Sequence, residues 1–176
     1  MEVKGTGLIT TKNFVKTKFP EKFDLWFNSL PEVSKKFYED VIDATKWYPI
    51  KESYLDPMDH IVKIFYNGNK AIGGDELGRY SAEVALTGVY KVFLLITSPT
   101  YLMKRGTKIF TTFYNPSELS VIEVSPTSAI VKISKFDELT ETMEYRIAGW
   151  LCRASEMANC KGIKYKIEKN LRKEVI

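Results

Sequence analysis

The fold is decided by one stretch of sequence, LSVIEVSPTSAIVKI at residues 119–133. The pattern from Leu119 to Val124, and again from Ala129 to Ile133, has the period of two that is typical of half-buried β-strands. The four residues between them, 125–128, read SPTS and are typical of a turn. This stretch therefore predicts an antiparallel hairpin.

Helical patterns dominate the chain before the hairpin. Pro20 and Pro31 are expected to separate successive helices, because proline is tolerated in the first turn of a helix but not in its interior. The pair Gly73-Gly74 is expected to loosen a linker before a helix from about Asp75 to Thr97, which is apolar nearly all round beyond Val84. Such a helix is expected to be buried.

Two further helices flank the hairpin. Ser98-Pro99 is a typical helix start, and this helix is expected to end near Tyr114. After the hairpin, Asp137 is expected to cap a long helix that ends at Lys161-Gly162.

Extended segments are expected near both ends of the chain. Val3 to Thr10 is expected to be extended, and its Gly5 and Gly7 suggest close approach by another backbone. Ile163 to Ile167 alternates apolar and charged residues and predicts a final strand. The sequence therefore predicts the α+β class, as a single domain over residues 1–176, with helices packed on one small antiparallel sheet made of terminal strands and the central hairpin.

Composition favours an ordinary globular protein. The chain has 176 residues, of which 44% are hydrophobic and 27% charged, and its net charge is +4. A domain of this size can bury a full core without a metal or a disulfide. The excess of basic residues is mild, and much of it lies in the stretch from Lys161 to Lys173. Glu168 interrupts this run of positive charge and Glu174 follows it, so we expect no nucleic-acid partner. The longest apolar run, 84–96, is too short and too interrupted to cross a bilayer, so we expect no membrane insertion.

Cysteine usage and the N-terminal residues indicate a cytoplasmic protein. Cys152 and Cys160 lie eight positions apart in one predicted helix, about 12 Å apart, which is too far for a disulfide. Free thiols are typical of a reducing compartment. Residues 1–6 contain no hydrophobic signal region.

Catalytic and metal-binding patterns are weak. His60 is the single histidine, and with Asp56 and Asp59 it offers a proton-transfer pair, although a half-buried histidine on a helix explains it as well. One histidine and two separated cysteines do not make a zinc site, and we expect no bound cofactor, metal or haem. No catalytic constellation is visible, so an enzyme ranks below a binding protein.

Aromatic residues are the unusual feature, at 13% of the chain. Several interrupt helical patterns, namely Trp47, Tyr48, Tyr54, Tyr66, Tyr80, Tyr90, Tyr101 and Tyr114. Tyrosine brings a polar group to an apolar wall, as a small-molecule pocket requires, although an aromatic-rich packed core would show the same residues. If the elements converge, a hydrophobic pocket is expected to be lined by Trp47, Tyr48, Tyr90, Phe93, Phe110 and Trp150.

Several of these segments also carry a resemblance. They are residues 47–49 (WYP), 77–83 (LGRYSAE), 87–93 (TGVYKVF), Ser98-Pro99 and the helix ending at Tyr114. Together they resemble a family of uncharacterised bacterial proteins plentiful in myxobacteria, itself similar to vinyl-4-reductase-like domains and TRAPP subunits. The resemblance covers nearly the whole chain. It implies a TRAPP-like α+β domain, often dimeric, whose relatives bind or sense hydrophobic molecules or act as assembly scaffolds.

Two departures limit what the resemblance implies. Relatives that coordinate metal or haem need more Cys or His than His60, Cys152 and Cys160 supply, and the lipid-bearing cysteine of some TRAPP subunits does not map onto Cys152. The leading hypothesis is a non-enzymatic domain that binds or senses a small hydrophobic molecule. The alternative is a dimeric protein-interaction or assembly module, and we expect a homodimer because the apolar helix beyond Val84 must be covered on every side.

Overall fold

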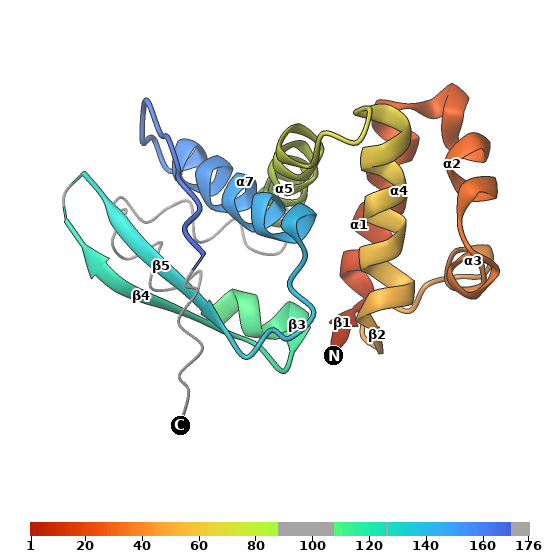
Figure 1. Ribbon diagram of the computed structural model, residues 1–176, viewed down its shortest axis with the longest axis horizontal. Coiled ribbons are helices and arrows are strands. Elements are labelled where there is room, and N and C mark those ends of the chain that lie inside the picture. The colour runs from red at the N-terminus through yellow and green to blue at the C-terminus, as the bar shows by residue number, and fades with distance from the viewer. Residues whose placement is uncertain (88–107, 126, 170–176) are drawn as a thin grey trace.

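The computed structural model describes residues 1–87, 108–125 and 127–169 (Figure 1). Its first part contains β1 (Glu2–Lys4), α1 (Gly5–Lys18), η1 (Pro20–Lys22), α2 (Phe23–Ser29), α3 (Glu32–Glu39), β2 (Trp47–Pro49), η2 (Lys51–Leu55), α4 (Asp56–Phe65) and α5 (Lys70–Thr87). A helical stretch at 108–113, β3 (Tyr114–Asn115), β4 (Glu118–Val124), β5 (Ala129–Ser134) and α7 (Glu141–Met157) follow. The α+β class is therefore confirmed.

The predicted hairpin is present as β4 and β5. These strands pair antiparallel, with Leu119 opposite Ile133 and Val124 opposite Ala129. A register shift lies between Val121 and Glu123, which places one extra residue on β4. Figure 1 shows the hairpin projecting on the side of α7 away from α1 and α4.

The prediction of one sheet that joins the hairpin to both terminal strands is wrong. In the described residues the strands form two sheets, a three-stranded sheet in the order β2-β1-β3 and the separate β4-β5 hairpin. No strand forms over 163–169, where Tyr165 instead donates to Asp75 Oδ1 at 3.2 Å. The alternation of that segment reflects half-burial of Ile163 and Ile167, with Lys164 and Lys166 exposed.

The N-terminal strand is shorter than predicted because a helix replaces most of it. β1 ends at Lys4 and α1 begins at Gly5. The predicted close approach of another backbone is nevertheless present, because a Cβ at Gly5 would overlap the carbonyl oxygen of Asp43. Gly5 N–H also donates to the carbonyl oxygen of Lys46 at 2.9 Å. This close approach leaves no room for a side chain at position 5, whether the segment is a helix or a strand.

Residues Trp47–Pro49 form an edge strand. β2 pairs with β1, so that Tyr48 lies opposite Val3 and Trp47 opposite Lys4. The residue before a proline is disfavoured in the helical region, which suits this extended backbone, but the pairing with β1 was not predicted. Proline suits an edge strand because it has no N–H to donate to a further neighbour.

The helix boundaries agree in part with the sequence. Pro20 and Pro31 separate α1, α2 and α3 as predicted. The long helix after the hairpin begins at Glu141 and not near Asp137, because Thr140 Oγ1 accepts the N–H of Met143 at 3.3 Å and caps it. Predictions for the helix beyond Thr87 and for Ser98-Pro99 fall outside the described residues.

The core has a large part and a small part. The large cluster joins the N-terminal part of the chain to α7. It contains Phe14, Trp26 and Tyr54 from the former and Met143 and Ile147 from α7. The small cluster fills the contact between α5 and α7 with Ala82, Leu86, Ala154 and Ala158. In Figure 1, α5 and α7 lie beside each other between the N-terminal helices and the hairpin. This pair of helices carries the candidate site.

Candidate ligand-binding site

Helices α5 and α7 touch through glycines. A Cβ at Gly78 would overlap the carbonyl oxygen of Arg146, and a Cβ at Gly149 would overlap that of Asp75. The pair Gly73-Gly74, expected to loosen a linker, lies inside α5, where a Cβ on Gly74 would come 2.6 Å from the carbonyl oxygen of Thr142. These glycines allow the two backbones to approach more closely than side chains would permit.

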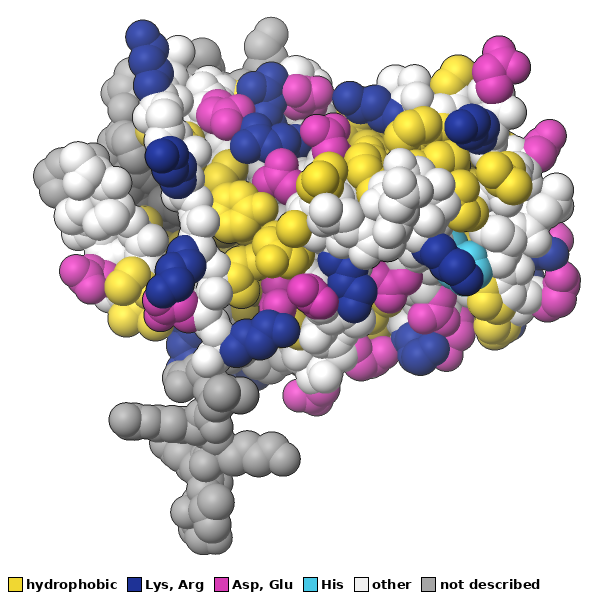
Figure 2. All heavy atoms as spheres, turned by 45° about the horizontal axis from the view of Figure 1, so that its top comes forward, with side chains coloured by type: hydrophobic (Ala, Val, Ile, Leu, Met, Phe, Trp, Pro, Cys, Tyr) yellow, Lys and Arg dark blue, Asp and Glu magenta, His cyan; other side chains and the backbone are white. Residues whose placement is uncertain are grey.

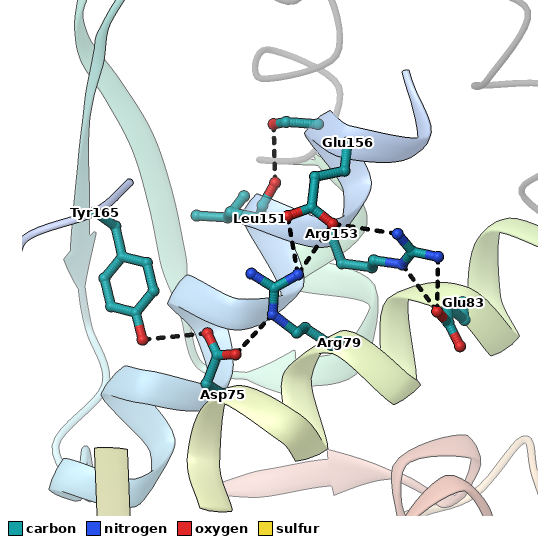
Figure 3. A network of polar contacts seen from close by, with 8 residues as sticks. Asp75, Arg79, Glu83, Leu151, Arg153, Glu156 and Tyr165 are labelled. Carbon is teal, nitrogen blue, oxygen red and sulfur yellow. Dashed lines mark hydrogen bonds and ion pairs between the residues drawn. The ribbon is translucent and has the colours of Figure 1, made fainter. Parts of the chain in front are cut away.

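On the solvent side of this contact lies a network of matched charges (Figure 3). Arg79 Nε donates to Asp75 Oδ2 at 2.6 Å, and Arg79 Nη1 donates to Glu156 Oε1 at 2.9 Å. Arg153 pairs with Glu83 at 2.8 Å and with Glu156 at 3.2 Å. The hydrogen bond from Arg79 holds the pKa of the Glu156 carboxyl below its ordinary value. Both arginines therefore have carboxylate partners.

A surface hollow of about 210 Å³ lies next to this network. Its lining residues are Lys18, Glu76, Arg79, Tyr80, Glu83 and Arg153. Lys18 lies 3.9 Å from Glu76, and the two arginines pair with carboxylates as described. Each charged side chain that lines the hollow therefore already has a partner of opposite charge. Acidic and basic side chains lie side by side on the face drawn in Figure 2.

A different arginine lies on the inner side of α7. Arg146 is only 5% exposed. Its Nη1 donates to the Tyr114 hydroxyl at 2.9 Å, and its Nη2 donates to Ser81 Oγ at 3.0 Å. The guanidinium carbon lies 5.1 Å from the ring centroid of Tyr54, whose hydroxyl is 3.1 Å from that of Tyr114. Hydroxyls and a ring face thus surround the cation.

No carboxylate partner for Arg146 is found in the part of the chain that the structure describes, and its Nε is buried without a hydrogen-bond partner. Burial lowers the pKa of Arg146, but Tyr114 and Tyr54 more than offset this, so its pKa is raised and the guanidinium stays charged. Burial raises the pKa of Tyr54 well above its ordinary value, so that this phenol is neutral. A buried charge without a counter-ion is rare because its desolvation is costly.

Aromatic rings surround this polar cluster. The ring centroid of Tyr114 lies 4.9 Å from that of Phe110 and 5.6 Å from that of Phe136. The ring centroid of Tyr54 lies 6.1 Å from that of Tyr114. The cluster of Tyr54, Ser81, Tyr114 and Arg146, called the Arg146 cluster below, is therefore a set of polar groups with an aromatic wall.

The aromatic residues predicted to line a pocket lie in different places. Phe110 is in the large core next to Tyr114, and Tyr48 packs against the same core. Trp47 lies beneath the Lys4 ammonium, which is 4.4 Å from its ring centroid. Trp150 packs against the small cluster between α5 and α7. Tyr90 and Phe93 fall outside the described residues, so Phe110 alone is placed at the Arg146 cluster.

The Arg146 cluster itself was not predicted from the sequence. Tyr54 and Tyr114 were noted as tyrosines that interrupt helical patterns, but they were not assigned to the pocket. Arg146 was missed, although it lies three residues after Met143 and four before Trp150, within the apolar stripe of its helix. A charged residue inside such a stripe is the signal that could have found it.

Each residue of the proposed proton-transfer group has a hydrogen-bond partner outside that group. His60 Nδ1 is 3.1 Å from Ser29 Oγ. Asp59 Oδ1 accepts from Thr142 Oγ1 at 2.6 Å, and Asp56 accepts from Lys51 at 3.1 Å. Burial lowers the pKa of His60. Both carboxylates thus have other partners.

The cysteines are free, as predicted. Cys152 is buried in α7, and burial raises the pKa of its thiol. Cys160 lies beyond the end of α7 at Met157, so the prediction that one helix carries both is wrong. Within residues 1–87, 108–125 and 127–169, no three His, Cys, Asp or Glu side chains are grouped to hold a metal ion. The same residues contain no helix with the length and hydropathy needed to cross a membrane.

Compared with protein-family models, curated proteins and solved structures, the chain gives no significant match.

Proposed function

We propose that this protein is a non-enzymatic domain that binds or senses a small hydrophobic molecule. The observation that carries the proposal is the Arg146 cluster, in which hydroxyls and a guanidinium with no carboxylate partner among the described residues lie within an aromatic core. Small-molecule sites combine mostly apolar walls with a few polar groups that orient the ligand. The resemblance to vinyl-4-reductase-like and TRAPP-like proteins supports the same function and a cytoplasmic location.

The chemistry of the cluster favours binding over catalysis. The charged guanidinium donates hydrogen bonds and accepts none, and the raised pKa of Tyr54 keeps its phenol protonated. Neither group takes up a proton readily, whereas a general base must do so near neutral pH. The cluster is thus suited to hold and orient a molecule.

Binding of the uncharged fluorescent dye Nile red tests the proposal. We expect saturable binding by the wild type and weaker binding by Phe110→Ala, which removes a ring next to Tyr114. The matched control is Phe14→Ala, because Phe14 is fully buried and its ring packs against Phe19 and Tyr80. It should cost about 3–5 kcal/mol of unfolding free energy and leave dye affinity unchanged in the folded fraction.

A packed core without a binding site would give a different result. A packed-core role for Phe110 predicts that Phe110→Ala also costs about 3–5 kcal/mol, with no dye bound by the wild type. That result would remove the binding proposal. A smaller loss of stability together with weaker dye binding supports it.

A second candidate function, a homodimeric assembly module, is favoured by the surface of the hairpin. Ile122 on β4 is 62% exposed and Ile130 on β5 is 51% exposed. Large exposed apolar side chains on a two-stranded hairpin are typical of contact surfaces. Light scattering at micromolar concentration tests this function, because a mass of 20.2 kDa means a monomer. A dimer that Ile122→Glu converts to that mass would support it.

A further inference from the structure

We infer that Arg146 binds the carboxylate group of an amphiphilic ligand, a molecule with one carboxylate and an apolar body. This inference rests on the proposed binding function and narrows its ligand to a chemical class. Three observations carry it: the free donor capacity of Arg146, the lack of an internal counter-charge, and the kind of groups that surround it.

The first observation is a count of donors. A guanidinium has five N–H groups, and the hydrogen bonds to Tyr114 and Ser81 use two of them. The Nε atom is buried and has no partner. The Nε–H and an adjacent Nη–H form a fork that matches the two oxygens of a carboxylate. Arg146 therefore has at least one buried donor, Nε–H, available to a carboxylate.

The second observation concerns counter-charges within the chain. Arg79 and Arg153, on the other side of the α5–α7 contact, each pair with carboxylates at 2.6 to 3.2 Å. Arg146 has none among the residues described. The sequence of residues 88–107 contains neither Asp nor Glu, and in residues 170–176 the only acidic side chain is Glu174. The chain thus offers almost no internal source of the missing charge.

The third observation distinguishes a carboxylate from a phosphate. Among the described residues, the groups that act electrostatically on Arg146 are the phenols of Tyr114 and Tyr54, and no second cation is one of them. A dianionic phosphate in an aromatic environment needs more positive charge than one guanidinium supplies, whereas a single carboxylate is matched by it. Phe110 and Phe136 pack against Tyr114 with their ring centroids 6.2 Å from each other, and their rings suit an apolar body attached to that carboxylate.

The test is a competition experiment with bound Nile red. The competitors are decanoate, 1-decanol and decyl phosphate, which share one alkyl chain and differ in the head group. We expect decanoate to displace the dye from the wild type at a concentration about 10-fold or more below that of 1-decanol, since a hydrogen bond to a charged group is worth roughly that factor. Decyl phosphate should compete less well than decanoate.

Variants assign the preference to Arg146. In Arg146→Met the ratio of decanol to decanoate concentrations should fall to about 1, and in Arg146→Lys, which keeps the charge and loses the fork, it should fall part of the way. The matched control is Arg153→Met, which removes an arginine from the same helix at the surface. It should keep the wild-type ratio. Glu174→Gln should also leave the affinity for decanoate unchanged.

Each contrary outcome has a separate meaning. Equal competition by decanoate and decanol, or an unchanged ratio in both Arg146 variants, overturns the inference and leaves the binding function in place. Stronger competition by decyl phosphate overturns the carboxylate class. Tighter decanoate binding in Glu174→Gln identifies an internal partner for Arg146 and also overturns it. A wild type that binds neither Nile red nor decanoate overturns both the function and the inference.

Discussion

The Arg146 guanidinium donates a hydrogen bond of 2.9 Å to the hydroxyl of Tyr114, and this bond joins α7 to the strand β3 inside the core. The same hydroxyl lies 3.1 Å from that of Tyr54 on η2. Three segments that are far apart in the sequence are thus connected by polar groups where apolar packing would be the ordinary arrangement. Such an arrangement is costly for stability, and ligand binding provides a reason for it.

Replacement of Arg146 by methionine measures that cost. Methionine fills a similar volume without a charge, and Tyr114 keeps the Tyr54 hydroxyl as a partner. We expect the free energy of unfolding, measured in urea without ligand, to be unchanged or to rise by about 1–2 kcal/mol, because the substitution removes a buried charge that has no carboxylate partner among the described residues. A loss of about 3–5 kcal/mol would instead mean that Arg146 is a structural residue.

The two tyrosines should differ when their hydroxyls are removed. Tyr114→Phe takes a partner from both Arg146 and Tyr54, so we expect a loss of about 2–3 kcal/mol of unfolding free energy. Tyr54→Phe leaves Tyr114 bonded to Arg146, and its loss should be about 0.5–1.5 kcal/mol. Urea unfolding of both variants checks the order. Equal losses would show that the Arg146–Tyr114 bond adds nothing to stability.

Close packing of α5 on α7 gives a prediction at Gly78. Within a helix, Gly→Ala ordinarily stabilises by up to about 1 kcal/mol. A Cβ at Gly78 would overlap the backbone of Arg146, so Gly78→Ala should destabilise by about 1–3 kcal/mol or more. The control is Gly68→Ala, which has open space and a φ of +76° and should lose only about 1 kcal/mol. A stabilised Gly78→Ala protein would contradict the described contact.

The sequence predicts the local elements better than the contacts between them. Local signals, which involve only neighbouring residues, include the period of two in 119–133 and the prolines at 20 and 31. The structure confirms the elements that these signals predict. Gly74 approaches Thr142 in a helix far along the chain, whereas Gly73 approaches Val62 of α4 and Tyr66 just after it. Local pattern therefore could not distinguish a loose linker from a close helix contact.

The site was predicted even less completely, for a related reason. Phe110 was selected because aromatic side chains are recognisable in a sequence, and it does lie beside Tyr114. Arg146 was not selected, because its position within the apolar stripe of its helix was not considered. Its burial depends on Ser81 of α5 and Tyr114 of β3, which only the folded chain brings to it.

His60 provides a test by titration. As the single histidine of the chain, it gives one set of imidazole C–H signals in proton NMR. Burial lowers its pKa, and Lys63 lowers it further, so the measured value should be below 6.5 and Lys63→Met should raise it. A pKa above 6.5 is the result expected of a proton-sharing pair with Asp56 or Asp59, and it would contradict the described arrangement.

The same shift has a consequence for stability. A group whose pKa is lower in the folded state than in the unfolded state contributes stability above its unfolded pKa, near 6.5, and this contribution is lost as the pH falls through the folded pKa. The free energy of unfolding of the wild type should therefore decrease below about pH 6.5. In His60→Gln this part of the decrease should be absent.

The Nε–H group of Arg146 gives the most direct test of ligand binding, since it is the donor left without a partner. Its signal in a nitrogen-15 NMR spectrum of the side-chain guanidinium groups can be assigned from its absence in Arg146→Lys. Added decanoate should move this signal, with the shift saturating as Nile red is displaced, and added 1-decanol should leave it in place. A signal that stays unmoved while decanoate displaces the dye would contradict the account.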